Sequence, residues 1–262
     1  MSGAASVAGL QIGALAGRSV RRTLRQPAMA IPPLVFPVAL MLVNSAGLEP
    51  STLLPGFPTD SFLAFALAVP FIQGALFATM GAGTELARDI QSGFLNRLSL
   101  TSLRGSALLL GHLAGVVVLG LAQAIFYIAV GLLVGVEFAA GTGGILVLLV
   151  YSIVVSFGFG ALGAFLALRT GSGESVQAMF PLLFVFLFIS SMNTPRDLIA
   201  VDWFRWAATL NPVSYLIECV RSLIITGWDA RALALGFGIA AIIAVVALAL
   251  AAWALTERMT RT

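Results

Sequence analysis

Residues 105–136 read GSALLLGHLAGVVVLGLAQAIFYIAVGLLVGV, an apolar run without a single Asp, Glu, Lys or Arg. At about 1.5 Å per residue, a helix of this length is longer than the roughly 30 Å of a bilayer's hydrocarbon core. Because that core holds no water, a crossing segment must satisfy its own backbone hydrogen bonds, and a helix does so. The run therefore predicts a transmembrane helix.

Five further stretches of span length also lack acidic and basic residues: 28–48, 61–84, 138–168, 175–194 and 232–256. Hydrophobic residues make up 60% of the 262 residues and charged residues 10%, against roughly 25% charged residues in a soluble domain. We therefore predict an all-α membrane protein with one transmembrane domain, 1–262. Residues 28–256 form its bundle of six transmembrane helices, and 257–262 form a tail.

The distribution of arginine predicts the orientation of the bundle. All 14 basic residues are Arg, and ten of them flank the spans on one side: Arg18, Arg21, Arg22, Arg25, Arg88, Arg97, Arg104, Arg169, Arg258 and Arg261. Basic residues are enriched in cytoplasmic loops. Both termini are therefore expected in the cytoplasm.

Residues 1–27 predict an amphipathic helix on the cytoplasmic membrane surface. One row of a helical wheel is apolar: Ile12, Ala16, Val20 and Leu24. The other side carries four basic residues: Arg18, Arg21, Arg22 and Arg25. Such a helix can bind anionic lipid headgroups. Alternatively, the arginines serve only to fix the topology.

The segment 203–228, between the fifth and sixth spans, is rich in aromatic residues but contains Asn211, Pro212, Glu218 and Arg221. A helix over 213–225 would be only about 20 Å long, too short to cross. We predict a re-entrant helical segment on the outer side, in which Glu218 and Arg221 pair at i and i+3. The alternatives are a surface helix in an ordered loop or a seventh span, which would place the C-terminus outside.

Catalytic and metal-binding signals are missing from the sequence. The chain has one His, one Cys and no acidic residue within any span, and it contains neither HExxH nor GxSxG. We expect no catalytic site and no metal site. Gln73 and Gln123 are polar positions within the spans, and each is expected to bond another helix or to line a pathway.

The energy source for any transport is expected to lie in another polypeptide. Ion-coupled carriers place ionisable groups near the bilayer midplane, and these spans have none. A P-loop requires a Lys, which the chain lacks. No cofactor is therefore expected in this chain, and ATP with Mg would be bound by a partner subunit.

The second cytoplasmic connection, 85–104, alternates charged with apolar residues. This pattern predicts a short amphipathic helix that docks onto a soluble partner; a solvated loop is the alternative. The residues expected to mediate docking are Glu85, Arg88, Asp89, Gly93, Arg97 and Arg104.

Two motifs resemble the membrane subunits of type-2 ABC exporters, the ABC-2 permeases, and most closely their daunorubicin-resistance-like branch. The first is Arg88-Asp89-Ile90-Gln91-Ser92-Gly93-Phe94-Leu95-Asn96-Arg97, followed by Arg104 and Gly111. The second is Asn211-Pro212-Val213-Ser214-Tyr215-Leu216-Ile217-Glu218-Cys219-Val220-Arg221, followed by Gly227. Ser102 stands about where the family tends to have Pro.

The resemblance implies a half-transporter in the bacterial plasma membrane. Two permease chains, identical or paralogous, would surround a pathway above two ABC ATPase subunits, which contact the N-terminal helix and the connection around Asp89, Gly93 and Arg97. The cargo would be a drug or a lipid-like, amphipathic molecule moved outward. A membrane scaffold without transport activity and an ion-coupled carrier remain as alternatives.

Overall fold

A computed structural model of the protein describes residues 13–22, 25, 27–94 and 105–260, and its regular elements there are all helical. Residues 13–22 form a first helix. The long helices are α2 (Pro27–Leu48), α4 (Ala68–Gln91), α6 (Gly105–Leu133), α7 (Gly141–Thr170) and α12 (Ala230–Thr260). The shorter ones are α3 (Phe62–Ala66), α8 (Gly173–Ala178), α9 (Phe180–Phe188), α10 (Asp202–Leu210) and α11 (Pro212–Arg221). Two 3-10 turns, η1 (Glu49–Leu53) and η2 (Arg196–Leu198), and a π turn, η3 (Ser222–Thr226), complete the described part.

Five of the six predicted spans are helices long and apolar enough to cross a membrane. The remaining predicted span, 175–194, which is the fifth along the chain, differs from the structure. There the apolar helical segment, α8 with α9, runs from Gly173 to Phe188, which is about 24 Å at 1.5 Å per residue and shorter than the hydrocarbon core. The helix ends early because polar side chains from a later segment bind the carbonyl groups at its end. The Asn211 amide nitrogen donates to Phe186 and Ile189 carbonyls at 2.5 and 2.6 Å.

Helix α4 lies at the centre of the bundle and is buried along most of its length. It packs against α7, α6, α2, α8 and α11. The approach to α7 is close at Gly163, where a Cβ would lie 2.0 Å from the Thr79 carbonyl oxygen. Only glycine leaves room for this contact, so α4 and α7 pack backbone against backbone.

Helix α2 has three prolines within it: Pro32, Pro33 and Pro37. Proline has no N–H, so Pro37 cannot bond the carbonyl of Pro33 four residues earlier. The hydroxyl of Tyr127 on α6 donates to that carbonyl at 2.5 Å. The neighbouring helix thus supplies the hydrogen bond that α2 lacks, as a backbone in hydrocarbon requires.

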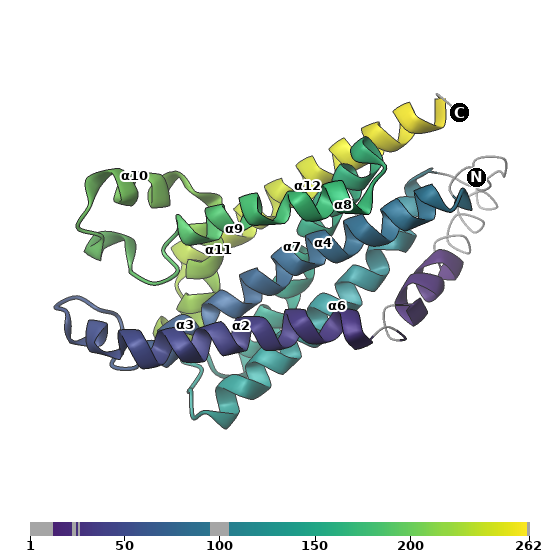
Figure 1. The fold of residues 1–262 in the computed structure, drawn as a ribbon. Helices are drawn as coiled ribbons and strands as arrows, with labels where there is room; N and C mark the ends of the chain where they lie inside the picture. The colour runs from purple at the N-terminus through teal and green to yellow at the C-terminus, as the bar shows by residue number, and fades with distance from the viewer. Residues whose placement is uncertain (1–12, 23–24, 26, 95–104, 261–262) are drawn as a thin grey trace.

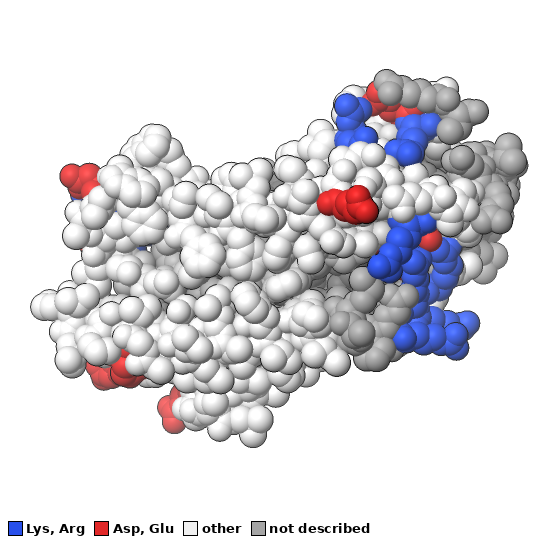
Figure 2. Space-filling view, in the orientation of Figure 1, with Lys and Arg blue, Asp and Glu red and all other residues white. Residues whose placement is uncertain are grey.

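The two ends of the bundle differ in charge. The first helix, 13–22, and the C-terminal end of α12 lie at one end, and α3 and α10 lie at the other (Figure 1). Figure 2 shows most of the visible arginine surface at the first end and an uncharged surface along the middle of the drawn face. An uncharged band between two polar ends is the pattern that a bilayer selects.

Candidate functional site

The first helix packs against α4 and α6 at the arginine-rich end. A Cβ on Gly111 of α6 would lie 2.4 Å from the Leu15 Cβ, so the glycine makes room for this crossing. Ser19 is buried, and its hydroxyl donates to the His112 carbonyl at 2.9 Å. The His112 Nε2 in turn lies 3.0 Å from the Ala82 carbonyl on α4. Three helices therefore meet through packing and polar contacts.

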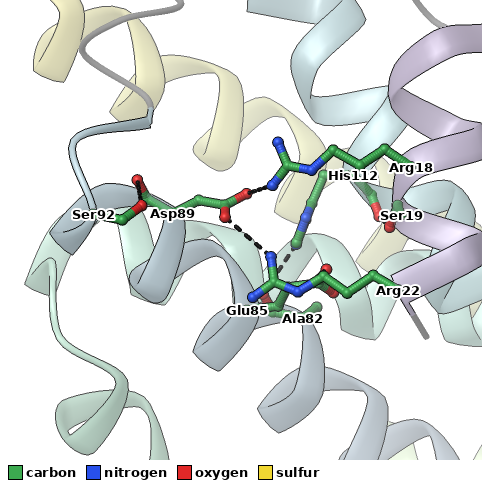
Figure 3. A network of polar contacts seen from close by, with 8 residues as sticks. All are labelled: Arg18, Ser19, Arg22, Ala82, Glu85, Asp89, Ser92 and His112. Atoms are coloured by element: carbon green, nitrogen blue, oxygen red, sulfur yellow. Dashed lines mark hydrogen bonds and ion pairs between the residues drawn. The ribbon is translucent and has the colours of Figure 1, made fainter. Parts of the chain in front are cut away.

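Two arginines of the first helix reach two acids of α4 (Figure 3). Arg18 Nη2 lies 2.6 Å from Asp89 Oδ2, and Arg22 Nη1 lies 3.0 Å from Asp89 Oδ1. Arg22 Nε also lies 3.3 Å from Glu85 Oε1. We call these four residues the polar clamp. It is partly shielded, because 16% of the Asp89 side chain and 25% of the Arg22 side chain are exposed.

The clamp depends on the helix α4 continuing past the apolar stretch. The prediction placed Glu85, Arg88 and Asp89 in a separate connection after residue 84; in the structure they lie on the last turns of α4 itself. These charged residues mark where α4 leaves the hydrocarbon, but the helical hydrogen bonding continues through them. Arg88 lies in the last turn, where a positive charge interacts favourably with the helix dipole. Gly93, with φ of +69°, then turns the chain.

The rest of the basic surface is open. Arg21 and Arg25 are exposed, and together with Arg18 and Arg22 they line a hollow of about 670 Å³. The guanidinium of Arg18 also lies 3.8 Å from the centre of the Phe94 ring, which anchors the chain after α4. Two further predicted docking residues, Arg97 and Arg104, lie outside the described residues.

The sequence did not indicate which side of the first helix packs on the bundle. Ser19 is the buried residue among 13–22, whereas Ala16 and Val20 of the predicted apolar row are half-buried. Ile12 and Leu24 of that row lie outside the described residues. A usable signal was the matched spacing of opposite charges. Arg18 and Arg22 are four residues apart, as are Glu85 and Asp89, so each pair presents a row of like charge to the other helix.

At the opposite end, the predicted pair of Glu218 with Arg221 is not formed. The Glu218 carboxylate instead pairs with Arg196 at 2.6 Å. Arg221 is 7% exposed, and its guanidinium donates to carbonyls of Phe65, Ser191 and Met192 at 3.3, 3.0 and 3.1 Å. Glu218 lies three residues before Arg221 on the same helix but does not pair with it. The three carbonyl groups around the buried Arg221 guanidinium need hydrogen-bond donors, and Arg221 supplies them.

The partner of Glu218, Arg196 on η2, was missed by the sequence analysis. Its guanidinium also lies 4.3 Å from the centre of the Tyr215 ring. Burial acts to lower the pKa of Arg196, but the nearby Glu218 carboxylate and hydrogen bonding raise it, and the net shift is upward. No pattern in the sequence indicates that residues 196 and 218 pair, because the path of the chain between them depends on the fold.

Asn211 and Pro212 start α11 as a cap and a first-turn proline. The Asn211 Oδ1 accepts from the Val213 N–H at 2.9 Å, and Pro212 occupies the first turn, where no donor is needed. Helix α11 is buried against α4 and α12, with Leu216, Ile217 and Val220 fully enclosed. This packing does not fit a helix on the surface of a loop.

Gln73 and Gln123 both lie inside the helical bundle, 1% and 2% exposed. The Gln123 amide oxygen approaches α4 at Gly74, where a Cβ would lie 3.1 Å from it. Within the described chain, neither polar atom of the Gln73 amide has a hydrogen-bond partner, nor has Gln123 Nε2. The expected bond between helices is therefore not made by these atoms.

Groups of three or more His, Cys, Asp or Glu side chains that could hold a metal ion do not occur among the described residues. The interactions that the structure shows around the polar clamp are ion pairs and hydrogen bonds to backbone carbonyls.

Comparison with known proteins identifies the family. The model of the ABC-2 type transporter family matches residues 10–225. The chain is 31% identical over 174 residues to the daunorubicin resistance ABC transporter permease protein DrrB1 of Streptomyces coeruleorubidus; the match covers 63% of this chain and 58% of that relative's length. The family consists of membrane subunits of transporters rather than enzymes, which agrees with the prediction. The chain belongs to the ABC-2 type transporter family and is a multi-pass membrane protein.

Proposed function

We propose that this chain is the permease subunit of an ATP-driven ABC exporter in a bacterial plasma membrane, and that its cargo is a drug or another amphipathic, lipid-like molecule. Family membership supports transport, and the similarity to a daunorubicin resistance permease favours export of a drug-like compound. The predicted spans contain no acidic or basic residue, which suits an amphipathic cargo better than a small ion.

In the proposed topology the chain crosses the membrane six times. The fifth crossing is made by α8 and α9 together with the following residues. Asn211 donates to the Ile189 carbonyl, and Arg221 donates to the Ser191 and Met192 carbonyls. Helices α10 and α11 form the re-entrant segment on the outer side. The arginine-rich end faces the cytoplasm together with both termini, and the helix 13–22 lies along that membrane surface.

The ATPase is proposed to dock at the polar clamp. The observation that carries this proposal is the continuity of α4, which runs without a break from Gln73 in the bundle to Asp89 in the clamp. A force applied to Glu85, Asp89 or the turn at Gly93 would move the most buried helix of the bundle. The opening of the pathway would then follow ATP binding, as in other two-state transporters.

The assembly is proposed to contain two copies of this permease, or this chain with a paralogue, and two ATPase subunits that bind ATP and Mg. The test is affinity purification from the native host in mild detergent, with identification of the bound subunits by mass spectrometry. Recovery of an ABC ATPase is expected. The purified complex is then placed in liposomes, and ATP-dependent movement of fluorescent daunorubicin is measured.

Substitutions in the clamp provide the matched comparison. Arg18→Glu is expected to lower cargo-stimulated ATP hydrolysis, because it opposes Asp89 with a like charge. Arg231→Glu, an exposed change at the other end of the bundle, should leave the hydrolysis unchanged. Transport by the isolated chain on an ion gradient would refute the proposal in favour of a carrier. A bound ATPase without any cargo movement would favour a scaffold.

A further inference from the structure

Helix α10 has three distinct faces. Its inward face contains Phe204 and the buried Ala208. A second face is polar and exposed: Asp202, Arg205 and Thr209. The third face is apolar and exposed: Trp203, Trp206 and Leu210, which are 67%, 68% and 61% exposed.

These faces are separated around the helix axis. With about 100° between successive residues, the polar set and the aromatic set each cover an arc of about 60°, and the centres of these two arcs lie about 100° apart. The polar face is satisfied internally, since Arg205 pairs with Asp202 and also donates to the Ile199 carbonyl. Among the described residues, the side chains of the aromatic face make no hydrogen bond or ion pair, and Trp203 contacts the ring of Phe204 on the same helix.

The position of α10 relates its aromatic face to the membrane. Asn211, which follows α10, donates to the Phe186 and Ile189 carbonyls at the end of the apolar helix α9. Leu210 therefore lies next to the end of a membrane helix, whose Phe186 and Phe188 are themselves half-exposed. The C-terminal end of α10 thus lies close to the end of α9.

The two indoles match the chemistry of the membrane interface. Tryptophan is enriched there because its ring is apolar and its N–H bonds to lipid headgroups and carbonyls. Within the described chain, no residue accepts a hydrogen bond from the indole N–H of Trp203 or Trp206. Both groups are thus available to lipid.

We propose that the Trp203, Trp206 and Leu210 face of α10 is a lipid-binding surface at the bilayer interface, where the two indoles lie among the glycerol and phosphate groups of phospholipid. The polar face of the same helix is directed to water. A second copy of the chain fits this surface less well. Three side chains on a helix of about 14 Å fall far below the roughly 800 Å² that each partner buries in a stable interface.

The chain's four tryptophans allow a direct test, which depends on the membrane and not on ATP-driven transport. Two reporters keep one residue each, Trp203 or Trp206, and the remaining tryptophans are changed to Phe. Both are reconstituted into phosphatidylcholine bilayers with lipid brominated near the headgroup end of its acyl chains. We expect the bromolipid to remove most of the fluorescence of each reporter and aqueous iodide to remove little.

The matched control places a tryptophan on the polar face. Thr209→Trp, in a chain with the other four tryptophans changed to Phe, should be quenched by iodide and not by bromolipid. A monodisperse elution peak in detergent shows that each variant is folded. Quenching of Trp203 and Trp206 by iodide alone would overturn the proposal, because the face would then lie in water. Quenching by neither agent would overturn it in favour of a covering protein chain.

Discussion

Neutralising Asp89 should release the first helix from the bundle. Asp89 makes two of the three ion pairs of the polar clamp, at 2.6 Å to Arg18 and 3.0 Å to Arg22. Asp89→Asn removes the charge and keeps the size and most of the hydrogen-bonding capacity of the side chain. The Arg22–Glu85 pair, at 3.3 Å, remains and keeps the release partial.

The magnitude follows from exposure. The Arg22–Asp89 pair is three-quarters shielded and is expected to contribute about 1 kcal/mol, near the upper end for such pairs. The Arg18 side chain is 39% exposed, so its pair is discounted by solvent screening to about 0.5 kcal/mol. A total of about 1.5 kcal/mol corresponds to about a tenfold larger population of chains with the first helix detached.

Limited trypsin digestion of the chain in lipid nanodiscs measures this population. Trypsin cuts after Arg21, Arg22 and Arg25 when the helix is detached, and at low protease the rate follows the open fraction. Asp89→Asn should speed cleavage at these sites about tenfold, as calculated from the lost pairing energy. Intact-mass spectrometry reports the position of each cut.

The control is Glu174→Gln. Glu174 is an exposed acid in the first turn of α8, without an ion pair within the described part of the chain. If Asp89→Asn and Glu174→Gln gave the same cleavage rates at the first helix, the clamp would not hold that helix, and the reasoning would be refuted.

Two further substitutions probe the packing. Arg221→Met should lower the apparent melting temperature in detergent, because three carbonyls lose a buried donor at about 1–3 kcal/mol each. Arg231→Met, at an exposed position, should leave the melting temperature unchanged. Equal melting temperatures for the two variants would contradict the role given to Arg221. Gly163→Ala should destabilise the protein by about 1–3 kcal/mol or more through overpacking, since its methyl group would meet the Thr79 carbonyl at 2.0 Å. Gly81→Ala on α4, where no other atom lies within 4 Å of the added carbon, is the comparison, and an equal fall in melting temperature for both would contradict the close contact of α4 with α7.

The membrane helices could be predicted because hydrocarbon imposes a strong local requirement on composition and length. The ends of these helices could not be predicted, because charged residues mark where a helix leaves the hydrocarbon and not where its hydrogen bonding stops. Helix α4 continues past Thr84 to Gln91 for this reason. Helix α9 ends before Thr194 although the sequence stays uncharged. Asn211 donates hydrogen bonds to the Phe186 and Ile189 carbonyls, which another turn of helix would otherwise have bonded.

The sequence singled out individual charged residues but not the residues with which they pair. Asp89 and Arg22 were both identified as functional candidates, but they are 67 residues apart, and the matched spacing of the two charged rows was not used to pair them. Glu218 was assigned the nearest arginine in sequence and binds Arg196 from another turn. Long-range ion pairs depend on the fold, and a spacing rule for one helix cannot select among several candidates.

The Tyr127 hydroxyl on α6 bonds the Pro33 carbonyl that Pro37 leaves without a donor, so the shape of α2 depends on α6. A helix interrupted by proline bends easily at the missing bond, and here one phenol on α6 determines whether that bend is stiff or free. A displacement of α6 that carried the hydroxyl beyond hydrogen-bonding distance, about 3 Å for an O–H donor, would break this contact and leave α2 free to kink. The first crossing of the membrane would then act as a joint, coupled to its neighbour through a single oxygen atom.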